Sequence, residues 1–124
     1  MTEKALQTAL AYYHAWTGRD FGAAMAYIDP DIVCEAPAGP LHGAEAFRAF
    51  MEPFSRIVRR ADLLAAFGDG ETALLMYDTD TVPVPGAPGA EWVTVRDGRI
   101  VHMRIIFDRA PFDAARVAQR GAQD

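Results

Sequence analysis

The sequence contains one cysteine, Cys34, so an intrachain disulfide is excluded and a cysteine cluster for structural zinc is absent. No apolar run approaches the roughly 20 residues that a membrane-spanning helix requires. The first ten residues, MTEKALQTAL, lack the basic and apolar regions of a signal peptide. These absences predict a cytoplasmic protein that has no membrane partner.

Positive charge is also scarce. The chain has 12 lysine and arginine residues against 17 aspartate and glutamate residues, which gives a net charge of −5. Its one tight basic group, Arg56, Arg59 and Arg60, is expected at the C-terminal end of a helix, where the helix dipole favours cations. An acidic domain without a basic stripe is a poor candidate for binding nucleic acid.

The three histidines, His14, His42 and His102, lie far apart, and the sequence contains neither an HxH nor an HExxH motif. No serine–histidine or cysteine–histidine spacing indicates nucleophilic catalysis. We therefore expect no metal site and no cofactor.

Hydrophobic residues are abundant, at 51% of the chain against 23% charged residues, which predicts a folded domain rather than a disordered one. The first half of the chain has the spacing of helices, and the second half has the alternation of strands. Helices followed by strands are typical of an α+β fold, with the helices on one face of a mostly antiparallel sheet.

The apolar spacing predicts three helices in the first half, over residues 2–17, 21–28 and 44–59. Asp20 is expected to cap the second helix, and Pro53 should kink or split the third. Between the second and third helices, residues 31–36 are expected to form a strand and residues 37–43 a loop.

From residue 61 onward the pattern predicts strands separated by turns, with Asp97-Gly98 as a type I′ hairpin. The proline-rich residues 82–89 are expected to form a hairpin loop outside the sheet. Residues 111–124 are expected to form a tail that begins with a helical turn. A curved sheet wrapped on three helices makes a cone, and the open end of a cone is a natural ligand pocket.

Three runs of the sequence resemble the nuclear-transport-factor-2-like superfamily and, within it, the SnoaL-like branch that includes polyketide cyclases. They are AYYHAWTGRDFGAAMAYIDPDIVCEAP, GPLHGAEAFRAF and AEWVTVRDGRIVHMRIIFD. Ketosteroid isomerases and limonene epoxide hydrolases are relatives of this branch. The resemblance implies a single SnoaL-like domain over residues 1–110, a cone-shaped mixed or antiparallel sheet, and a homodimer formed through that sheet.

The resemblance transfers functional residues only in part. In ketosteroid isomerases a tyrosine and a carboxylic acid that an apolar site keeps neutral form an oxyanion hole. By the resemblance, these two residues fall on Tyr12 and Glu91. The catalytic base of those enzymes falls on Ala36, which cannot accept a proton. Two positions of the epoxide hydrolase Asp–Arg–Asp constellation fall on Asp78 and Asp80, and the third falls on Ile105. Neither of these two mechanisms is preserved.

Three acids are the candidate catalytic residues. Asp78 and Asp80 are two apart on a predicted strand, so they share a face, and close carboxylates suit general acid–base work. Glu91 lies in an otherwise apolar strand, where a carboxylate faces either a polar cavity or a strand edge. For the aspartates, a solvent-facing polar row is the alternative.

The candidate ligand-binding residues come from one helix face and several strands. Tyr12 and Tyr13 lie four and three residues before Trp16, so each shares a helix face with it. Core packing is the favoured interpretation for any one of them, and we expect Trp16 and at least one tyrosine to contact a ligand. The resemblance places the Met103–Ile105 side of the last strand in the pocket. The full set is Tyr12, Tyr13, Trp16, Glu35, Met76, Met103 and Ile105.

Three functions remain open from the sequence. The first is a SnoaL-like enzyme of isomerase or cyclase type that performs cofactor-independent acid–base chemistry on a small apolar carbonyl compound. The second is a non-catalytic binding domain for a small hydrophobic molecule. The third is an interaction module with a filled cone, in which Tyr13, Trp16 and Met103 pack without a void.

Overall fold

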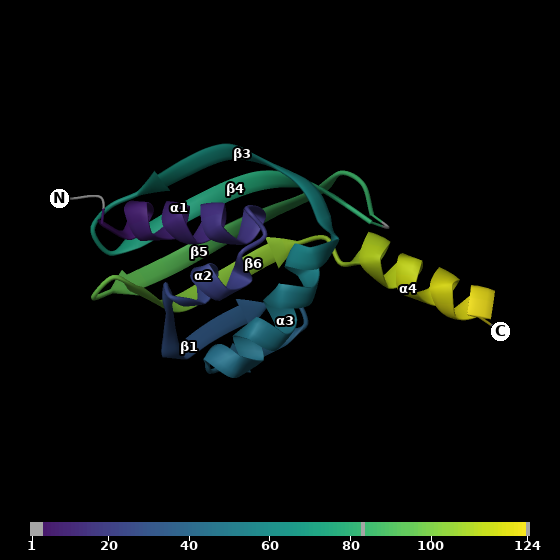
Figure 1. Ribbon diagram of the computed structural model, residues 1–124, viewed down its shortest axis with the longest axis horizontal. Helices are drawn as coiled ribbons and strands as arrows, with labels where there is room; N and C mark the ends of the chain where they lie inside the picture. The colour runs from purple at the N-terminus through teal and green to yellow at the C-terminus, as the bar shows by residue number, and fades with distance from the viewer. Residues whose placement is uncertain (1–3, 83, 124) are drawn as a thin grey trace.

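A computed structural model describes residues 4–82 and 84–123 of the chain (Figure 1). Its helices are α1 (Lys4–Thr17), α2 (Phe21–Met25), α3 (Ala44–Ile57) and α4 (Ala110–Gln123). Its strands are β1 (Ile28–Ala36), β2 (Gly39–His42), β3 (Val58–Gly68), β4 (Thr72–Thr81), β5 (Ala87–Arg96) and β6 (Arg99–Phe107). The first helix was predicted from residue 2, and residues 2 and 3 lie outside the described residues.

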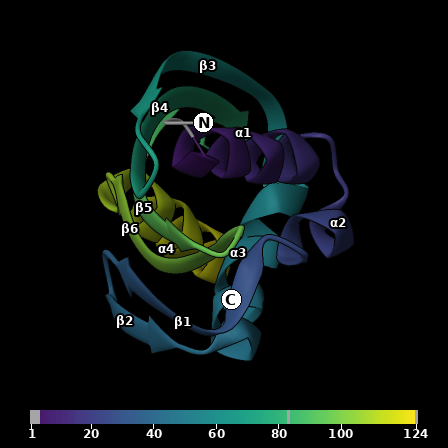
Figure 2. The same ribbon diagram turned by 90° about the vertical axis from the view of Figure 1, so that its left-hand side faces the viewer.

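The strands form one six-stranded sheet in the order β2-β1-β6-β5-β4-β3. Strands β1 and β6 run parallel, with Cys34 opposite Met103, and the other neighbours run antiparallel. Figure 2 shows the sheet curling around α1, which lies on its concave side, with β3 and β4 arching over the helix. The predicted α+β fold with a curved, cone-shaped mixed sheet is confirmed.

Helix α1 packs against β3, β4, β5 and β6 through one buried stripe. The stripe begins with small residues, Ala5 and Ala9, and ends with large ones, Tyr12, Tyr13 and Trp16. Alanines allow the helix to approach the sheet closely at its start, where Ala5 N donates to Asp69 O at 3.1 Å. The three aromatic residues fill the wider space at the other end, so the helix itself helps to make the cone.

Several boundaries differ from the prediction. Residues 39–42 form the edge strand β2, paired with β1, where the sequence predicted a loop, and an edge strand tolerates Pro40. Helix α3 ends at Ile57 because Val58 is extended, so Arg59 and Arg60 belong to β3 and are not at a helix terminus. The loop predicted over 82–89 is shorter, since β5 already begins at Ala87.

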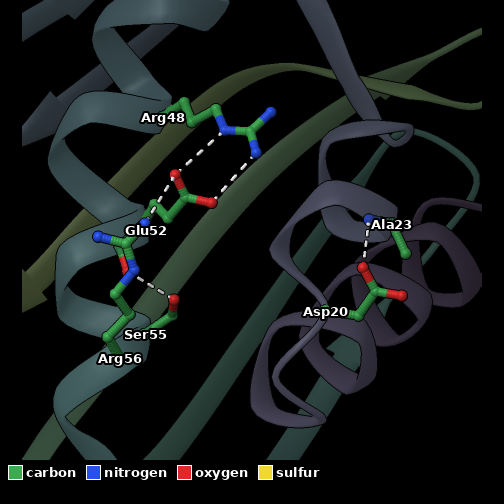
Figure 3. A network of polar contacts seen from close by, with 6 residues as sticks. All are labelled: Asp20, Ala23, Arg48, Glu52, Ser55 and Arg56. Atoms are coloured by element: carbon green, nitrogen blue, oxygen red, sulfur yellow. Dashed lines mark hydrogen bonds and ion pairs between the residues drawn. The ribbon is translucent and has the colours of Figure 1, made fainter.

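Helix α3 continues through Pro53 as one helix, so of the kink or split that the sequence predicted, the split is absent. Figure 3 shows Glu52 on its outer surface between Arg48, at 3.1 Å, and Arg56, at 3.6 Å. Exposed i,i+4 pairs of this kind add modestly to the stability of a helix and offset part of the effect of the proline.

The predicted cap and turn are present. Figure 3 also shows Asp20, whose Oδ1 accepts a hydrogen bond of 3.0 Å from Ala23 N and caps α2. Asp97 and Gly98 have φ values of 54° and 76°, the left-handed conformation that a type I′ turn requires. This tight turn joins β5 directly to β6, and it thereby sets the register between these two strands.

Candidate functional site

The inner faces of β4 and β5 carry polar groups into the core. On β4 the buried residues alternate as Ala73, Leu75, Tyr77, Thr79 and Thr81. On β5 the buried face presents Glu91, Val93 and Val95, while Trp92 is exposed on the other face. Glu91 is 1% exposed, so of the two positions that the sequence left open for this carboxyl, the structure shows an inward one.

Glu91 is hydrogen-bonded to a tyrosine on the neighbouring strand. The hydroxyl of Tyr77 donates to Oε1 of Glu91 at 2.7 Å. Tyr77 lies opposite Gly89, two residues before Glu91, and diagonal neighbours on one face of a sheet are within reach of long side chains. Gly89 also leaves room for the ring, since a Cβ there would lie 3.1 Å from Cε2 of Tyr77.

Burial changes the acidity of both partners. It raises the pKa of Glu91 from 4.5 to about 7, against the opposing effect of the hydrogen bond from Tyr77. Burial and the nearby Glu91 charge raise the pKa of Tyr77 well above its ordinary value. Tyr77 therefore stays a hydroxyl donor, while Glu91 exchanges its proton near neutral pH, where acid–base catalysts work best.

Three further buried donors surround this pair. The hydroxyls of Tyr12 and Tyr13 and Nε1 of Trp16 have no hydrogen-bond partner within the described residues. The rings of Tyr13 and Trp16 lie 5.4 Å and 5.7 Å from the Tyr77 ring. Burial, followed by the Glu91 charge, raises the pKa of Tyr12 well above its ordinary value. All three side chains face inward, as predicted, and they form the apolar and donor-rich surroundings of Glu91.

A cavity of about 450 Å³ opens beside Tyr77, between α3, α4 and the ends of the strands. Its wall is largely apolar and includes Phe50, Phe54, Phe107 and Phe112 together with Ile105. Tyr77 belongs both to this wall and to the buried polar cluster. The side chain of Tyr77 therefore lies between the cavity and Glu91.

Asp78 and Asp80 do not face this cavity. Both are exposed on the outer face of β4, together with Met76, so their predicted inward orientation is wrong. Across the strand pair, Asp78 lies opposite Asp62 and Asp80 opposite Arg60. The physical reason is the two-residue period of a strand, because the inward positions are taken by Tyr77 and Thr79.

Glu35 is also on the outer face, which corrects its prediction as a ligand-binding residue. Its Oε2 lies 2.8 Å from Nε2 of His102 and 3.0 Å from the Arg104 guanidinium. The hydrogen bond from Arg104, then that from His102, lowers the pKa of Glu35. This carboxylate is engaged at the surface and does not reach the cavity.

Of the remaining predicted ligand-binding residues, Met103 and Ile105 point inward, and Ile105 lines the cavity. Tyr12, Tyr13, Trp16 and Met103 lie deeper, in the buried core. Tyr77 and Phe112, which were not predicted as site residues, lie in the cavity wall. The sequence carries no clear signal for Tyr77, because apolar residues occupy both faces of β4.

Metal-ligating groups and the single cysteine can be checked in the described part of the chain. Within residues 4–82 and 84–123, no group of three or more histidine, cysteine, aspartate or glutamate side chains is placed to hold a metal ion. Burial raises the pKa of the Cys34 thiol to about 12, so the nucleophilic thiolate is not formed at neutral pH.

No helix in the described part of the chain is both long and apolar enough to cross a membrane.

A family model and solved structures match the chain. The model of the SnoaL-like domain matches residues 9–103. A crystal structure of a protein from Kribbella flavida DSM 17836 is 65% identical, with a TM-score of 0.91, over 94% of this chain and 97% of that one. No curated protein matches the sequence.

Two more distant structures share the fold. A steroid delta-isomerase from Pseudomonas aeruginosa is 18% identical, with a TM-score of 0.74, over 96% of this chain and 95% of that one. A putative polyketide cyclase from Sinorhizobium meliloti is 22% identical, with a TM-score of 0.70, over 81% of this chain and 94% of that one. At these identities the likeness concerns the fold alone.

Proposed function

The chain belongs to the SnoaL-like domain family, and from this premise we propose that it is a cofactor-independent enzyme that transfers protons on a small, mostly apolar carbonyl compound. The observation that carries this proposal is the position of Tyr77, which lines the cavity and is hydrogen-bonded to the buried Glu91. Proteins of this fold that are named steroid delta-isomerase and putative polyketide cyclase support small-molecule chemistry as the activity class.

In the proposed reaction, the Glu91–Tyr77 pair acts on the carbonyl oxygen. Protonated Glu91 donates to the oxygen of Tyr77, and the Tyr77 hydrogen is then free to bond to a carbonyl oxygen in the cavity. A carbon next to that carbonyl loses its proton to a water molecule in the cavity, and the electrons of the C–H bond form the enolate. Hydrogen bonding from a preorganised donor stabilises the charge that develops on the oxygen.

This assignment replaces the aspartates as catalytic residues. Asp78 and Asp80 are outside the cone, and Ala36 stands where ketosteroid isomerases have their base. Glu91 has the raised pKa that proton exchange near pH 7 needs, and Tyr77 keeps its hydroxyl proton. The proposed chemistry is therefore general-acid polarisation of a carbonyl.

The test is exchange of the protons next to the carbonyl of 2-tetralone, a bicyclic apolar ketone, followed by NMR in D₂O. We expect the protein to accelerate exchange over buffer, and Tyr77→Phe and Glu91→Gln to lower that rate by about 100-fold, a typical general acid–base contribution. Asp80→Asn, which removes an exposed carboxylate from the outer face, is the matched control and should retain the wild-type rate. Equal exchange by wild type, Tyr77→Phe and Glu91→Gln contradicts the proposal.

A binding domain without turnover is the second candidate. It is favoured by the placement of Glu91 behind Tyr77, so that the carboxyl itself does not line the cavity. In that case 2-tetralone raises the unfolding temperature of the protein, while exchange stays at the buffer rate. A purely structural module is disfavoured because its cone should be filled, and a cavity of about 450 Å³ is present.

We also propose that two copies of the chain associate through the outer face of the sheet. This face exposes large apolar side chains on neighbouring strands, where isolated proteins usually avoid contiguous apolar surface. They are Leu64, Phe67, Leu74, Met76, Trp92 and Ile106. Sedimentation equilibrium should give the mass of a dimer for the wild type, and Trp92→Glu should shift it to the monomer. A monomeric wild type contradicts the proposal.

A further inference from the structure

The charged side chains in the cavity wall carry a net positive charge, whereas the chain as a whole is negatively charged. They are Arg109, Asp113 and Arg116, which come from α4 and the residue before it. The whole chain has a net charge of −5, yet this set of two arginines and one aspartate has a net charge of +1. The cavity mouth is therefore a local cationic region on an acidic protein.

Arg109 and Arg116 both form ion pairs with the carboxylate of Asp113. Asp113 Oδ2 lies 3.8 Å from the Arg109 guanidinium, and Arg116 donates to Oδ1 of the same carboxylate. The side chains of Arg109 and Arg116 are 47% and 62% exposed. Exposed ion pairs of this kind contribute little, so an incoming anion can draw either arginine away from Asp113 at small cost.

An aromatic cluster holds α4 at the mouth. The Phe112 ring meets Phe54 of α3 at 6.2 Å and Phe107 of β6 at 5.7 Å, in edge-to-face geometry. Figure 1 shows α4 leaving the body of the fold next to α3 and the end of β6. The first turn of α4 is thus placed at the cavity, where Arg109 and Asp113 belong to the wall and remain partly exposed.

We propose that the cavity selects carboxylate-bearing substrates, with the apolar body of the molecule among the phenylalanines and its carboxylate on Arg109 and Arg116. This inference rests on the proposed function, because it names the substrate class of the same cavity. Arginine guanidinium groups suit carboxylate recognition because their planar donors match the two oxygens. The carbonyl to be polarised then faces Tyr77, which lines the same cavity.

The experiment compares 2-naphthoate with its neutral counterpart 2-naphthamide, using naphthalene fluorescence to measure binding to the full chain. We expect the wild type to prefer the acid by about tenfold at low salt, in line with two partly exposed charge-assisted contacts. The double variant Arg109→Gln, Arg116→Gln should bind the two compounds within about twofold of each other and keep its affinity for the amide.

The matched control is Arg48→Gln, which removes one positive charge from an i,i+4 pair on α3 away from the cavity wall and should keep the preference for the acid. Equal wild-type affinities for acid and amide overturn this inference alone. A double variant that loses both compounds also overturns it, since the arginines then shape the cavity and do not select. If the wild type binds neither compound, the inference fails together with the proposed pocket, whereas exchange insensitive to Tyr77→Phe refutes only the proposed chemistry.

Discussion

The hydroxyl of Tyr77 lies 2.7 Å from Oε1 of Glu91, across the boundary between strands β4 and β5. Tyr77 lines the cavity, and Glu91 is fully buried behind it. One residue of the cavity wall is therefore hydrogen-bonded to a carboxyl whose pKa burial raises to about 7. Both the stability of the fold and the proposed chemistry depend on this contact.

The raised pKa of Glu91 predicts that stability falls as pH increases. The folded chain keeps this proton up to about pH 7, whereas the unfolded chain releases it near 4.5. Between these values the folded state binds more protons, so the free energy of unfolding decreases with pH, by about 3 kcal/mol in all. Urea denaturation from pH 4.5 to 8 should show this decrease, and Glu91→Gln should lack its share of it.

Glu71→Gln is the control for this measurement, because Glu71 is exposed in the turn before β4. It should retain the wild-type dependence on pH. At pH 8 Glu91→Gln should also be more stable than the wild type, since a neutral amide avoids the burial of a charge. Parallel pH profiles for wild type and Glu91→Gln contradict the assigned pKa.

A second prediction concerns the pH dependence of 2-tetralone exchange. The proposed mechanism uses Glu91 in its protonated form, which is lost as pH rises through about 7. Enzyme-catalysed exchange, corrected for the rate in buffer, should therefore fall above pH 7. The residual rate of Glu91→Gln should be independent of pH between 6 and 8. A catalysed rate that rises through pH 7 shows that the carboxylate is the active form.

Strand β4 shows where prediction from the sequence reaches its limit. The inward orientation of Glu91 was predictable because its strand neighbours are apolar on one face. On β4, however, apolar residues occupy both faces, with Leu74 and Met76 outside and Leu75 and Tyr77 inside. A pattern without clear alternation does not indicate which face is buried, and a shift of one residue reverses every side chain.

The inward threonines explain why the aspartates were misplaced. Thr79 Oγ1 donates to Ala87 O at 2.6 Å, and the Thr81 hydroxyl donates to Val84 O. These hydroxyls satisfy one carbonyl group at the start of β5 and one in the connection before it, and the sequence of β4 alone does not show these partners. Two polar residues are therefore buried where two acids were expected.

Gly89 provides a third prediction, because it accommodates the Tyr77 ring. In Gly89→Ala the new Cβ lies 3.1 Å from Cε2 of Tyr77, so the ring must shift from its place beside Glu91. We expect a loss of about 1–2 kcal/mol in stability from overpacking, together with slower 2-tetralone exchange. The matched change Gly22→Ala meets its nearest atom at 3.6 Å in α2 and should be neutral or stabilising. Unchanged exchange in Gly89→Ala contradicts the need for this ring position.

A fourth prediction separates the mouth of the cavity from the core. Phe112 ties α4 to Phe54 and Phe107, so Phe112→Ala should release the helix while the sheet and α1 stay intact. Affinity for 2-naphthoate should fall by about tenfold, and the free energy of unfolding by no more than about 2 kcal/mol, since Phe112 is only partly buried. Val117→Ala, at a site 62% exposed on the same helix, should change neither quantity. Wild-type affinity in Phe112→Ala shows that α4 is not part of the binding site.

Two tyrosine-to-phenylalanine substitutions should change stability in opposite directions. Tyr12 is fully buried, and its hydroxyl has no partner within the described residues. Tyr12→Phe removes an unpaired polar atom and should raise the free energy of unfolding by about 1 kcal/mol. Tyr77→Phe removes the donor to Glu91 and leaves a buried carboxyl without that bond, so it should lower the free energy of unfolding by about 1–3 kcal/mol.

Urea denaturation of both variants at pH 7 measures the difference. If Tyr12→Phe is as destabilising as Tyr77→Phe, the Tyr12 hydroxyl is bonded in solution to a group such as an internal water molecule, and the polar cluster around Glu91 is hydrated.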